Sequence, residues 1–529
     1  MTEKKSDCKS CDDLTARLDR LEKRLEIQED STKHWKKRWS RVDEQLRDAT
    51  GKISLLTVEN TKFRKVIEKK NARISNLEKA LFAESSEASP VAELEPDSEI
   101  QEAPPKKPRG KQRGTKGFGR KIRTELPVEE VFHDIAAAEK CCAECGKLRE
   151  RLPFTEDSEE VHYVWKLVRI KHKRVKYKRT CGCTSQKRVV TAPPPPKLIP
   201  KGMLSTELWA HILIEKFLLQ RPISRICKSL SLRGFVVSDG AIANGLKHLT
   251  KLFAPLYIGI RHHVRSAKHW QMDETHWRVF TDLMGKLNHK WWLWVTETKD
   301  ATFFKLDPSR SSAVPMKILA GIEAGILTCD RYSAYKRLQE QGILLSYCWA
   351  HVRRDFLEIQ NGFPSLKQFA NKYIGWIDLL FHNNKNRVAL GTETELKNIL
   401  ELMNRDAKRL LKRKDTHAEA AAALSSLINH WDGLTLFLHH PSIPMDNNAS
   451  ERALRNPVVG RKNYYGSRSI WSGCLAEMLF SIFATLEKNK VNPYQFMLSY
   501  LTACARNQGR APQDASSFLP WNSAQKVAA

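Results

Sequence analysis

Hydrophobic positions near the start of the chain follow a heptad pattern. An apolar seam in strict 4-3 spacing predicts a coiled coil over residues 12–82. Isoleucines at a positions and leucines at d positions favour a parallel dimer, and Asn60 at an a position would fix its register. The alternative is an antiparallel hairpin within one chain, for which Gly51 is the candidate turn. The seam consists of Leu14, Leu18, Leu21, Leu25, Gln28, Thr32, Trp35, Trp39, Val42, Leu46, Ala49, Ile53, Leu56, Asn60, Phe63, Ile67, Lys70, Ile74, Leu77 and Leu81.

Between residues 263 and 358 the pattern changes to short, apolar, aromatic-rich runs that alternate with helical stretches. The order is strand, strand, strand, helix, strand, helix, strand, helix, which is typical of a ribonuclease-H-like domain. In that arrangement the first strand is central and pairs with the fourth. The pairing would place Asp273, inside the first strand, beside Asp330, at the end of the fourth.

The remaining patterns are helical. We expect a helical domain over residues 193–262, in which two helices joined by a Gly-containing turn are compatible with a helix-turn-helix. Any two packed helices give the same pattern. A charged, all-helical insertion is expected over residues 359–440, followed by the second part of the ribonuclease-H-like domain over 441–510 and a C-terminal tail over 511–529.

The stretch DNNASERALR, which begins at Asp446, predicts the start of a short helix that Pro457 soon ends. Glu451 falls in the first turn of this helix. One interpretation is a capping box with Asn448 and an i,i+4 pair with Arg455. The other is a functional carboxylate, for which Asp446 is the competing candidate.

Charge and cysteine usage narrow the class of protein. The formal net charge is +29 with a pI near 9.6, which favours a polyanionic partner, most simply DNA, over an anionic membrane surface. We find neither a signal-peptide core nor an apolar run of membrane-spanning length, so we expect an intracellular protein whose cysteines are reduced. Two close pairs then predict a structural zinc site within a basic module over residues 126–192, made of Cys142, Cys145, Cys181 and Cys183.

Two alternatives remain for these cysteines: Cys141 could replace Cys142, or the four could be small buried hydrophobes.

Residues 83–125 predict a disordered linker, acidic and Ser/Pro-rich at first. Its second half, residues 106–123, is a basic arm that resembles arms lying in the DNA minor groove. A solvated tether explains the arm as well. Its candidate DNA contacts are Lys106, Lys107, Arg109, Lys111 and Arg113.

Asp273, Asp330 and Glu451 together predict a site for two Mg²⁺ ions, because hard cations take oxygen ligands. One ion would activate water to attack a phosphodiester and the other would stabilise the departing 3′-oxygen. Glu274 should point to the opposite face of the sheet. His351 could be a metal ligand, but because it follows an apolar strand we expect a hydrogen-bonded structural role. Basic residues that would steady phosphates, or form a solvated face, are Arg353, Arg354, Arg452, Arg455, Arg461 and Lys462.

The chain resembles transposases of the insertion sequence 66 family of bacterial mobile elements. The resemblance rests on Asp273-Glu274-Thr275, on CDRYSAY from Cys329, on WAHVRR from Trp349, on DNNASERALR, and on GRKN from Gly460 and LPWN from Leu519. It implies Mg²⁺-dependent cleavage of element ends and strand transfer into target DNA by three acidic residues. It also implies small helper proteins in some members and activity in the bacterial cytoplasm, at the nucleoid.

The overall expectation is a multidomain protein with a coiled coil, a four-cysteine zinc module, a helical domain and a ribonuclease-H-like α/β catalytic domain with an all-helical insertion. Its partners would be DNA and a second copy of the chain, or more copies, without a membrane. Two other functions compete with the transposase. One is a non-catalytic dimeric DNA-binding regulator, which leaves the three carboxylates unexplained. The other is a nuclease of the same fold that does not join strands.

Overall fold

A computed structural model describes residues 9–82, 189–282, 290–387 and 391–522, with scattered positions between 130 and 187. The chain divides into two compact units, and residues 1–89, 172–232 and 236–529 form the first. The second unit, residues 90–171 and 233–235, contains most of the predicted linker and the first cysteine pair, and little of it is described. The elements below belong to the first unit.

A five-stranded mixed sheet forms the centre of this unit, with strand order β5-β4-β3-β6-β7. Strands β3 to β5 make an antiparallel meander, whereas β6 runs parallel to β3, and β7 parallel to β6. The first strand of the predicted series therefore pairs with the fourth, as expected. The strand bounds are β3 His269–Arg278, β4 Lys290–Glu297, β5 Thr302–Asp307, β6 Gly325–Cys329 and β7 Ile343–Tyr347.

Helical segments connect the strands where the sequence predicts them, with one difference in type. The short helix α6, Ala313–Ile318, precedes β6, and α7, Trp349–Gly362, follows β7. The segment between β6 and β7, η4 Ser333–Gln341, is a 3-10 helix rather than an α-helix. It ends at Gly342, whose φ of 85° is a left-handed conformation that glycine adopts at little cost.

Two C-terminal helices cover one face of the sheet. They are α13 Asn448–Tyr464, which contacts β3 and β4, and α14 Ile470–Lys488, which contacts β5. Trp277 on β3 is buried between them, edge-on to Tyr464 and to Phe480. On the opposite face Tyr335 of η4 packs edge-on against Trp294 of β4. The large aromatic runs of the sequence thus form the core on both sides of the sheet.

The expectation that Pro457 ends the helix carrying Glu451 is wrong. Helix α13 continues through Pro457 to Tyr464. Ser450, Leu454, Pro457 and Gly460 are its buried residues, and this spacing forms one stripe facing the sheet. Burial of that stripe outweighs the cost of a proline inside a helix, which is about 3 kcal/mol.

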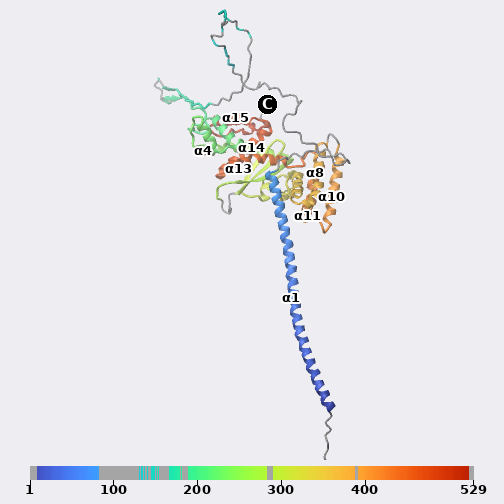
Figure 1. Cartoon of the computed structure of the whole chain (residues 1–529). Helices are drawn as coiled ribbons and strands as arrows, with labels where there is room; N and C mark the ends of the chain where they lie inside the picture. The colour runs from blue at the N-terminus through green and yellow to red at the C-terminus, as the bar shows by residue number, and fades with distance from the viewer. Residues whose placement is uncertain are drawn as a thin grey trace, which may run out of the picture. The chain divides into compact units, whose positions relative to one another are not determined.

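Helices that precede the strands in the sequence pack together with helices that follow them. Helices α2 and α15 contact each other, α4 and α5 contact α14, and α5 also contacts β5. Figure 1 shows α4, α14 and α15 gathered on one side of the sheet. The bounds are α2 Thr206–Leu213, η2 Ile214–Leu218, α3 Ile223–Ser231, α4 Asp239–Leu249, η3 Thr250–Leu252, α5 Ala254–Ser266, α15 Pro493–Arg506 and η7 Ala515–Phe518.

Helices α3 and α4 form the predicted helix-turn-helix pattern, because they contact each other across a turn that contains Gly234. Ser238 caps α4 by accepting a hydrogen bond from the amide of Ala241. Whether α4 reads DNA stays a prediction. The small antiparallel pair β1 Lys176–Lys178 and β2 Val189–Thr191 precedes this region.

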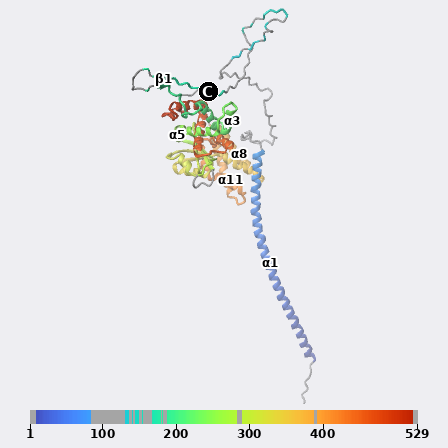
Figure 2. The same ribbon diagram turned by 90° about the vertical axis from the view of Figure 1, so that its left-hand side faces the viewer.

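Between α7 and α13 the described residues form helices joined by turns and contain no strand, as predicted for the insertion. Its helices gather on the side of the sheet away from α4 and α15, and the perpendicular view again shows α8 beside α11 (Figures 1 and 2). They are η5 Pro364–Leu366, α8 Lys367–Lys385, α10 Glu393–Leu411, α11 Ala418–Asn429, α12 Trp431–Thr435 and η6 Leu436–Leu438.

The N-terminal seam lies on one uninterrupted helix, α1 Lys9–Phe82. The helix passes through Gly51 without a turn, so the alternative of an antiparallel hairpin is excluded. Most apolar seam residues are more than half exposed, for example Leu25 and Ile53. Pairing of this helix with a second copy stays a prediction.

Helix α14 is long and apolar enough, by composition alone, to cross a membrane, with a mean hydropathy of 1.3. Two-thirds of that stretch is buried inside the protein. Glu477, within it, accepts a hydrogen bond from the amide of Leu306 and pairs with Lys305 on β5. These contacts are those of a core helix that covers a sheet.

Candidate active site

The register of the sheet places Asp273 and Asp330 at the same level. Gln271 on β3 pairs with Thr328 on β6, so the residues two positions further along each parallel strand are Asp273 and Asp330. Strand β6 ends at Cys329, and Asp330 follows it immediately. Its Oδ1 accepts a hydrogen bond of 3.0 Å from the amide of Tyr332, which turns the chain away from the sheet.

Asn447 fastens the segment before Glu451 to the central strand. Its side-chain Nδ2 donates a hydrogen bond of 2.7 Å to the carbonyl of Met272, the neighbour of Asp273. Its backbone amide donates to Cys348 Sγ at 3.2 Å. In addition, the amide of Trp349 donates to the carbonyl of Met445 at 2.9 Å. We call these three bonds the Asn447 latch.

Helix α13 begins directly after the latch, with Glu451 in its first turn. The Glu451 side chain is 27% exposed and faces His351, whose Nε2 lies 3.6 Å from Glu451 Oε1. No side-chain hydrogen bond caps the first turn of α13, and Asn448 instead donates its amide to Asp446 Oδ1. The capping-box interpretation of Glu451 is therefore wrong.

The three carboxylates influence one another electrostatically. Burial, together with the nearby charges of Glu274, Asp330 and Glu451, raises the pKa of Asp273 to about 7, although the amide of Glu274 donates to its Oδ1. His351 is influenced by the same acids. Burial lowers its pKa, as does Arg354, while Glu451 and Asp330 oppose this change. Its Nδ1 is buried without a hydrogen-bond partner among the described residues.

Glu274 points to the other face of the sheet, as predicted. Its side chain is 1% exposed and pairs with Arg310 at 2.7 Å, while the Tyr335 hydroxyl donates to it at 2.5 Å. Arg310 in turn lies over the rings of Trp292 and Tyr332. This Glu274 cluster, which consists of Glu274, Arg310, Tyr335, Trp292 and Tyr332, joins the strand that carries Asp273 to the turn that follows Asp330.

As the side chains stand, no group of three or more His, Cys, Asp or Glu among the described residues is arranged closely enough to hold a metal ion. The chemistry of the donor set nevertheless fits Mg²⁺. Asp273, Asp330 and Glu451 offer only oxygen ligands. They also repel one another, and a divalent cation is the group that offsets such repulsion.

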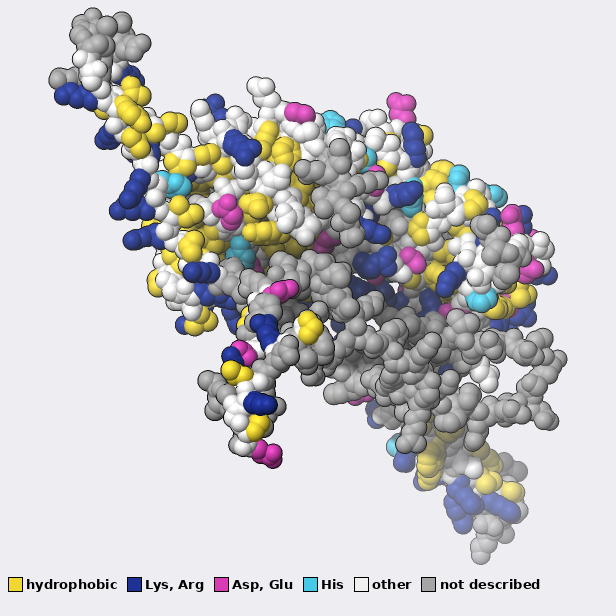
Figure 3. All heavy atoms as spheres, turned by 90° about the horizontal axis from the view of Figure 1, so that it is seen from above, with side chains coloured by type: hydrophobic (Ala, Val, Ile, Leu, Met, Phe, Trp, Pro, Cys, Tyr) yellow, Lys and Arg dark blue, Asp and Glu magenta, His cyan; other side chains and the backbone are white. Residues whose placement is uncertain are grey.

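The predicted basic residues differ in their surroundings. Arg461 donates to the hydroxyl of Thr275 and to the carbonyl of His276 on β3. Arg353 is held by Asp378 of α8 at 2.6 Å. Arg354, Arg452, Arg455 and Lys462 are exposed. On the face drawn in Figure 3, Lys and Arg side chains are spread over several elements rather than gathered in one patch.

Several predicted site residues lie outside the described residues. They are the arm residues Lys106, Lys107, Arg109, Lys111 and Arg113 and three of the four zinc-ligand candidates, Cys142, Cys181 and Cys183. Cys145 is described and is an exposed free thiol.

Sequence reasoning missed the Asn447 latch, the Glu274 cluster and the contact of His351 with Glu451. For His351 a signal existed, since Cys348 and His351 lie three positions apart at the end of an apolar strand. Both proved to touch the segment that carries Glu451. The other two depend on partners distant in the chain.

Comparison with known proteins finds relatives that span most of the chain. The chain is 24% identical to the uncharacterized protein y4jD of Sinorhizobium fredii over 78% of its own length and 83% of the relative's. It is 26% identical to the uncharacterized protein y4qI of the same bacterium, over 84% of each chain. The profile of the transposase IS66 family matches residues 201–474, a span that includes the sheet, Asp273, Asp330 and Glu451. The chain therefore belongs to the IS66 family of transposases.

Proposed function

We propose that this chain cuts DNA at the ends of a mobile element and joins the freed ends to target DNA. The observation that carries the proposal is that Asp330 and Glu451, from distant parts of the chain, are near enough to Asp273 to raise its pKa. Asp273 and Asp330 follow paired residues of parallel strands, and the Asn447 latch holds the segment before Glu451 against the central strand. The strand order, with its central first strand and helical insertion, is that of a ribonuclease-H-like domain, the fold we infer for this region.

Asp273, Asp330 and Glu451 would hold two Mg²⁺ ions, and Asp273 would be the ligand contributed by the central strand. When bound, these ions would lower the pKa of a coordinated water and neutralise the charge that develops on the departing 3′-oxygen. Joining would use the freed 3′-hydroxyl as the nucleophile in the same site.

The residues around the carboxylates would orient them. His351 faces Glu451 at 3.6 Å and restricts where its carboxylate can turn. The Glu274 cluster fixes the turn after Asp330, because Tyr332 and Arg310 stack there and the Tyr332 hydroxyl donates to the carbonyl of Arg310. Arg452, Arg455, Arg461 and Lys462, on the same helix as Glu451, would contact phosphates of the DNA.

We further infer a set of partners and cofactors. DNA would be bound by the basic arm and by a zinc module built from Cys142, Cys145, Cys181 and Cys183. A second copy of the chain would pair through the α1 seam. Small helper proteins of the same element would take part in the reaction. The net charge of +29 supports DNA as the polyanionic partner.

The test is Glu451→Gln in the full chain with DNA that carries the element ends. We expect Mg²⁺-dependent cleavage to fall by at least about 1,000-fold while DNA affinity stays unchanged, because the substitution removes one charged ligand but keeps the shape of the side chain. Glu401→Gln, an exposed residue of α10, is the matched control. Full cleavage by Glu451→Gln would refute the role of Glu451 in the site. Cleavage by the unmodified chain without joined products would indicate a nuclease.

A further inference from the structure

Helix α1 presents two different faces near its C-terminal end. The heptad seam continues into this region, where Ile74 is 52% and Leu77 is 54% exposed. Ala72, in contrast, is 4% exposed, although it lies between those seam positions and Lys70. Residues two positions apart on a helix point about 200° apart around its axis. The buried face of α1 is therefore opposite the exposed seam.

The buried face contacts α7. Ala72 lies against Gly362, and a Cβ placed on Gly362 would be only 2.7 Å from the Cβ of Ala72. Three hydrogen bonds follow along the same face. The Ser75 hydroxyl donates to the carbonyl of Asn361, Asn76 donates to the carbonyl of Glu358, and Lys79 Nζ donates to Asn361 Oδ1 at 2.8 Å. Glycine at 362 is required because any larger residue would push the two helices apart.

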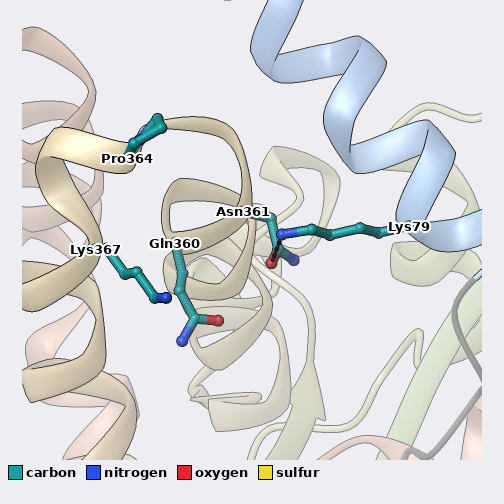
Figure 4. Close-up of a pocket in the computed structure, with 5 residues that line it drawn as sticks. All are labelled: Lys79, Gln360, Asn361, Pro364 and Lys367. Atoms are coloured by element: carbon teal, nitrogen blue, oxygen red, sulfur yellow. Dashed lines mark hydrogen bonds between the residues drawn. The ribbon is translucent and has the colours of Figure 1, made fainter.

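One turn earlier, the same face of α1 contacts the helical insertion. Lys69 Nζ lies 2.8 Å from Glu419 Oε1 on α11, and Glu68 lies 3.6 Å from His417. Beside the contact of α1 with α7 is a pocket of about 420 Å³, lined by Lys79, Gln360, Asn361, Pro364 and Lys367. Figure 4 shows Lys79 reaching Asn361 from α1 across this pocket.

We propose that α1 binds a second copy of this chain through its seam while its opposite face stays docked on α7 and α11 of its own chain. The seam offers one self-complementary surface for a parallel partner, and Asn60 would pair with its counterpart there. Because one helix carries both contacts, the dimer axis is rigidly connected to each sheet-containing core. The spacing of the two carboxylate sites is then fixed by α1. This inference shares the coiled-coil dimer with the proposed function, but it does not depend on the proposed chemistry.

The experiment uses the full chain without DNA or Mg²⁺. A zero-length carbodiimide reagent, which joins amines to carboxylates in direct contact, is applied to an equal mixture of ¹⁵N-labelled and unlabelled chains that has been unfolded and refolded together. Mass spectrometry then detects the Lys69–Glu419 product, and sedimentation measures the mass. We expect a dimer whose Lys69–Glu419 products contain either label alone and never both.

Three variants separate the two faces. Gly362→Leu should lower the Lys69–Glu419 product at least about tenfold and keep the dimer mass. Gly375→Leu is the matched control, because a Cβ at Gly375 meets nothing within 4 Å. Leu46→Glu with Ile53→Glu and Leu56→Glu should give a monomer that keeps the product. Mixed-label products, a monomeric wild type, or an undiminished product in Gly362→Leu would each overturn the proposal.

Discussion

Asp273 carries its charge in an unfavourable place. It is half-buried, and its neighbours Glu274, Asp330 and Glu451 are all acids. A carboxyl whose pKa is about 7 in the folded protein and near 3.8 when unfolded destabilises the fold as pH rises from about 4 to 7, and the full penalty remains above that window. Such strain at a site is expected where function, rather than stability, determines the residue.

Asp273→Asn should therefore stabilise the metal-free protein and abolish cleavage. The amide keeps the acceptor for the backbone of Glu274 and removes the repelled charge. We expect a gain of about 1–2 kcal/mol in the free energy of unfolding at pH 8, after allowance for solvent screening. Chemical denaturation in the presence of a chelator measures it. A less stable variant would mean that Asp273 is not repelled by its neighbours.

Lys216, in the short helix η2, is a second charged residue whose pKa is shifted. Lys216 Nζ sits over the ring of Tyr464 at the end of α13, 2.9 Å from its centre. Burial lowers the pKa of Lys216 to about 7. The unfolded chain takes up a proton on Lys216 near pH 10.5, whereas the folded chain does so only near pH 7. The folded protein therefore loses stability as pH falls from about 10.5 to about 7.

Lys216→Met should remove this dependence on pH. Between pH 9.5 and 7 the wild type should lose stability relative to the variant, by at most about 1.4 kcal/mol per pH unit. Urea unfolding at several pH values gives the comparison. Parallel curves for the two proteins would show that Lys216 is charged throughout the range.

At the scale of elements, the Asn447 latch determines where α13 begins. The buried Asn447 side chain links the start of this helix to the central strand, over a separation of 175 positions in the chain. Helix α13 then keeps one stripe against the sheet as far as Tyr464, through Pro457. The position of Glu451 thus follows from one amide and one packed stripe.

Asn447→Ala should weaken both stability and cleavage. Loss of the bond to Met272 leaves a buried carbonyl without its donor, which costs about 1–3 kcal/mol. Glu451 would also lose its fixed position. Cleavage should therefore fall even at a temperature where the variant is folded, at which lower stability alone would cause no loss. Asn448→Ala, at the half-exposed neighbour, is the control. Equal cleavage by both variants would argue against a positioning role for Asn447.

Local pattern predicted the strands and their order, because burial on both faces makes strand runs conspicuous. The pairing that brings Asp273 to Asp330 was predicted from the ribonuclease-H-like arrangement that this order suggests. Glu451 was selected because of the two aspartates upstream, and the local pattern misjudged the helix around it. Pro457 is compatible with the helix only because its face is buried, and no local rule contains that information. The latch and the Glu274 cluster could not be predicted either, since Asn447 and Arg310 find their partners across the sheet.

At the scale of the whole molecule, the cysteines separate into two populations. Among the described residues, Cys227, Cys329, Cys348 and Cys504 are buried in the core and Cys474 is half-buried, whereas Cys145 is exposed. An exposed thiol close in sequence to other cysteines is available to a metal, as the zinc prediction requires.

Replacing Cys142 and Cys145 together with Ser should release about one zinc ion per chain, if four thiolates share one ion. Inductively coupled plasma mass spectrometry of the purified protein measures this. The matched control replaces Cys8 and Cys11, the other pair with the same spacing. Equal zinc content in all three proteins would remove the zinc module.

The latch also ties the two ends of the helical insertion together, since Trp349 opens α7 and Met445 lies just before α13. Because this bond joins the two ends of the insertion, it hardly constrains the length of the chain between them. Doubling the length of such a loop costs only about 0.6 kcal/mol. We therefore expect the insertion to accept longer, shorter or exchanged helices while Glu451, whose position depends on the latch, keeps its place.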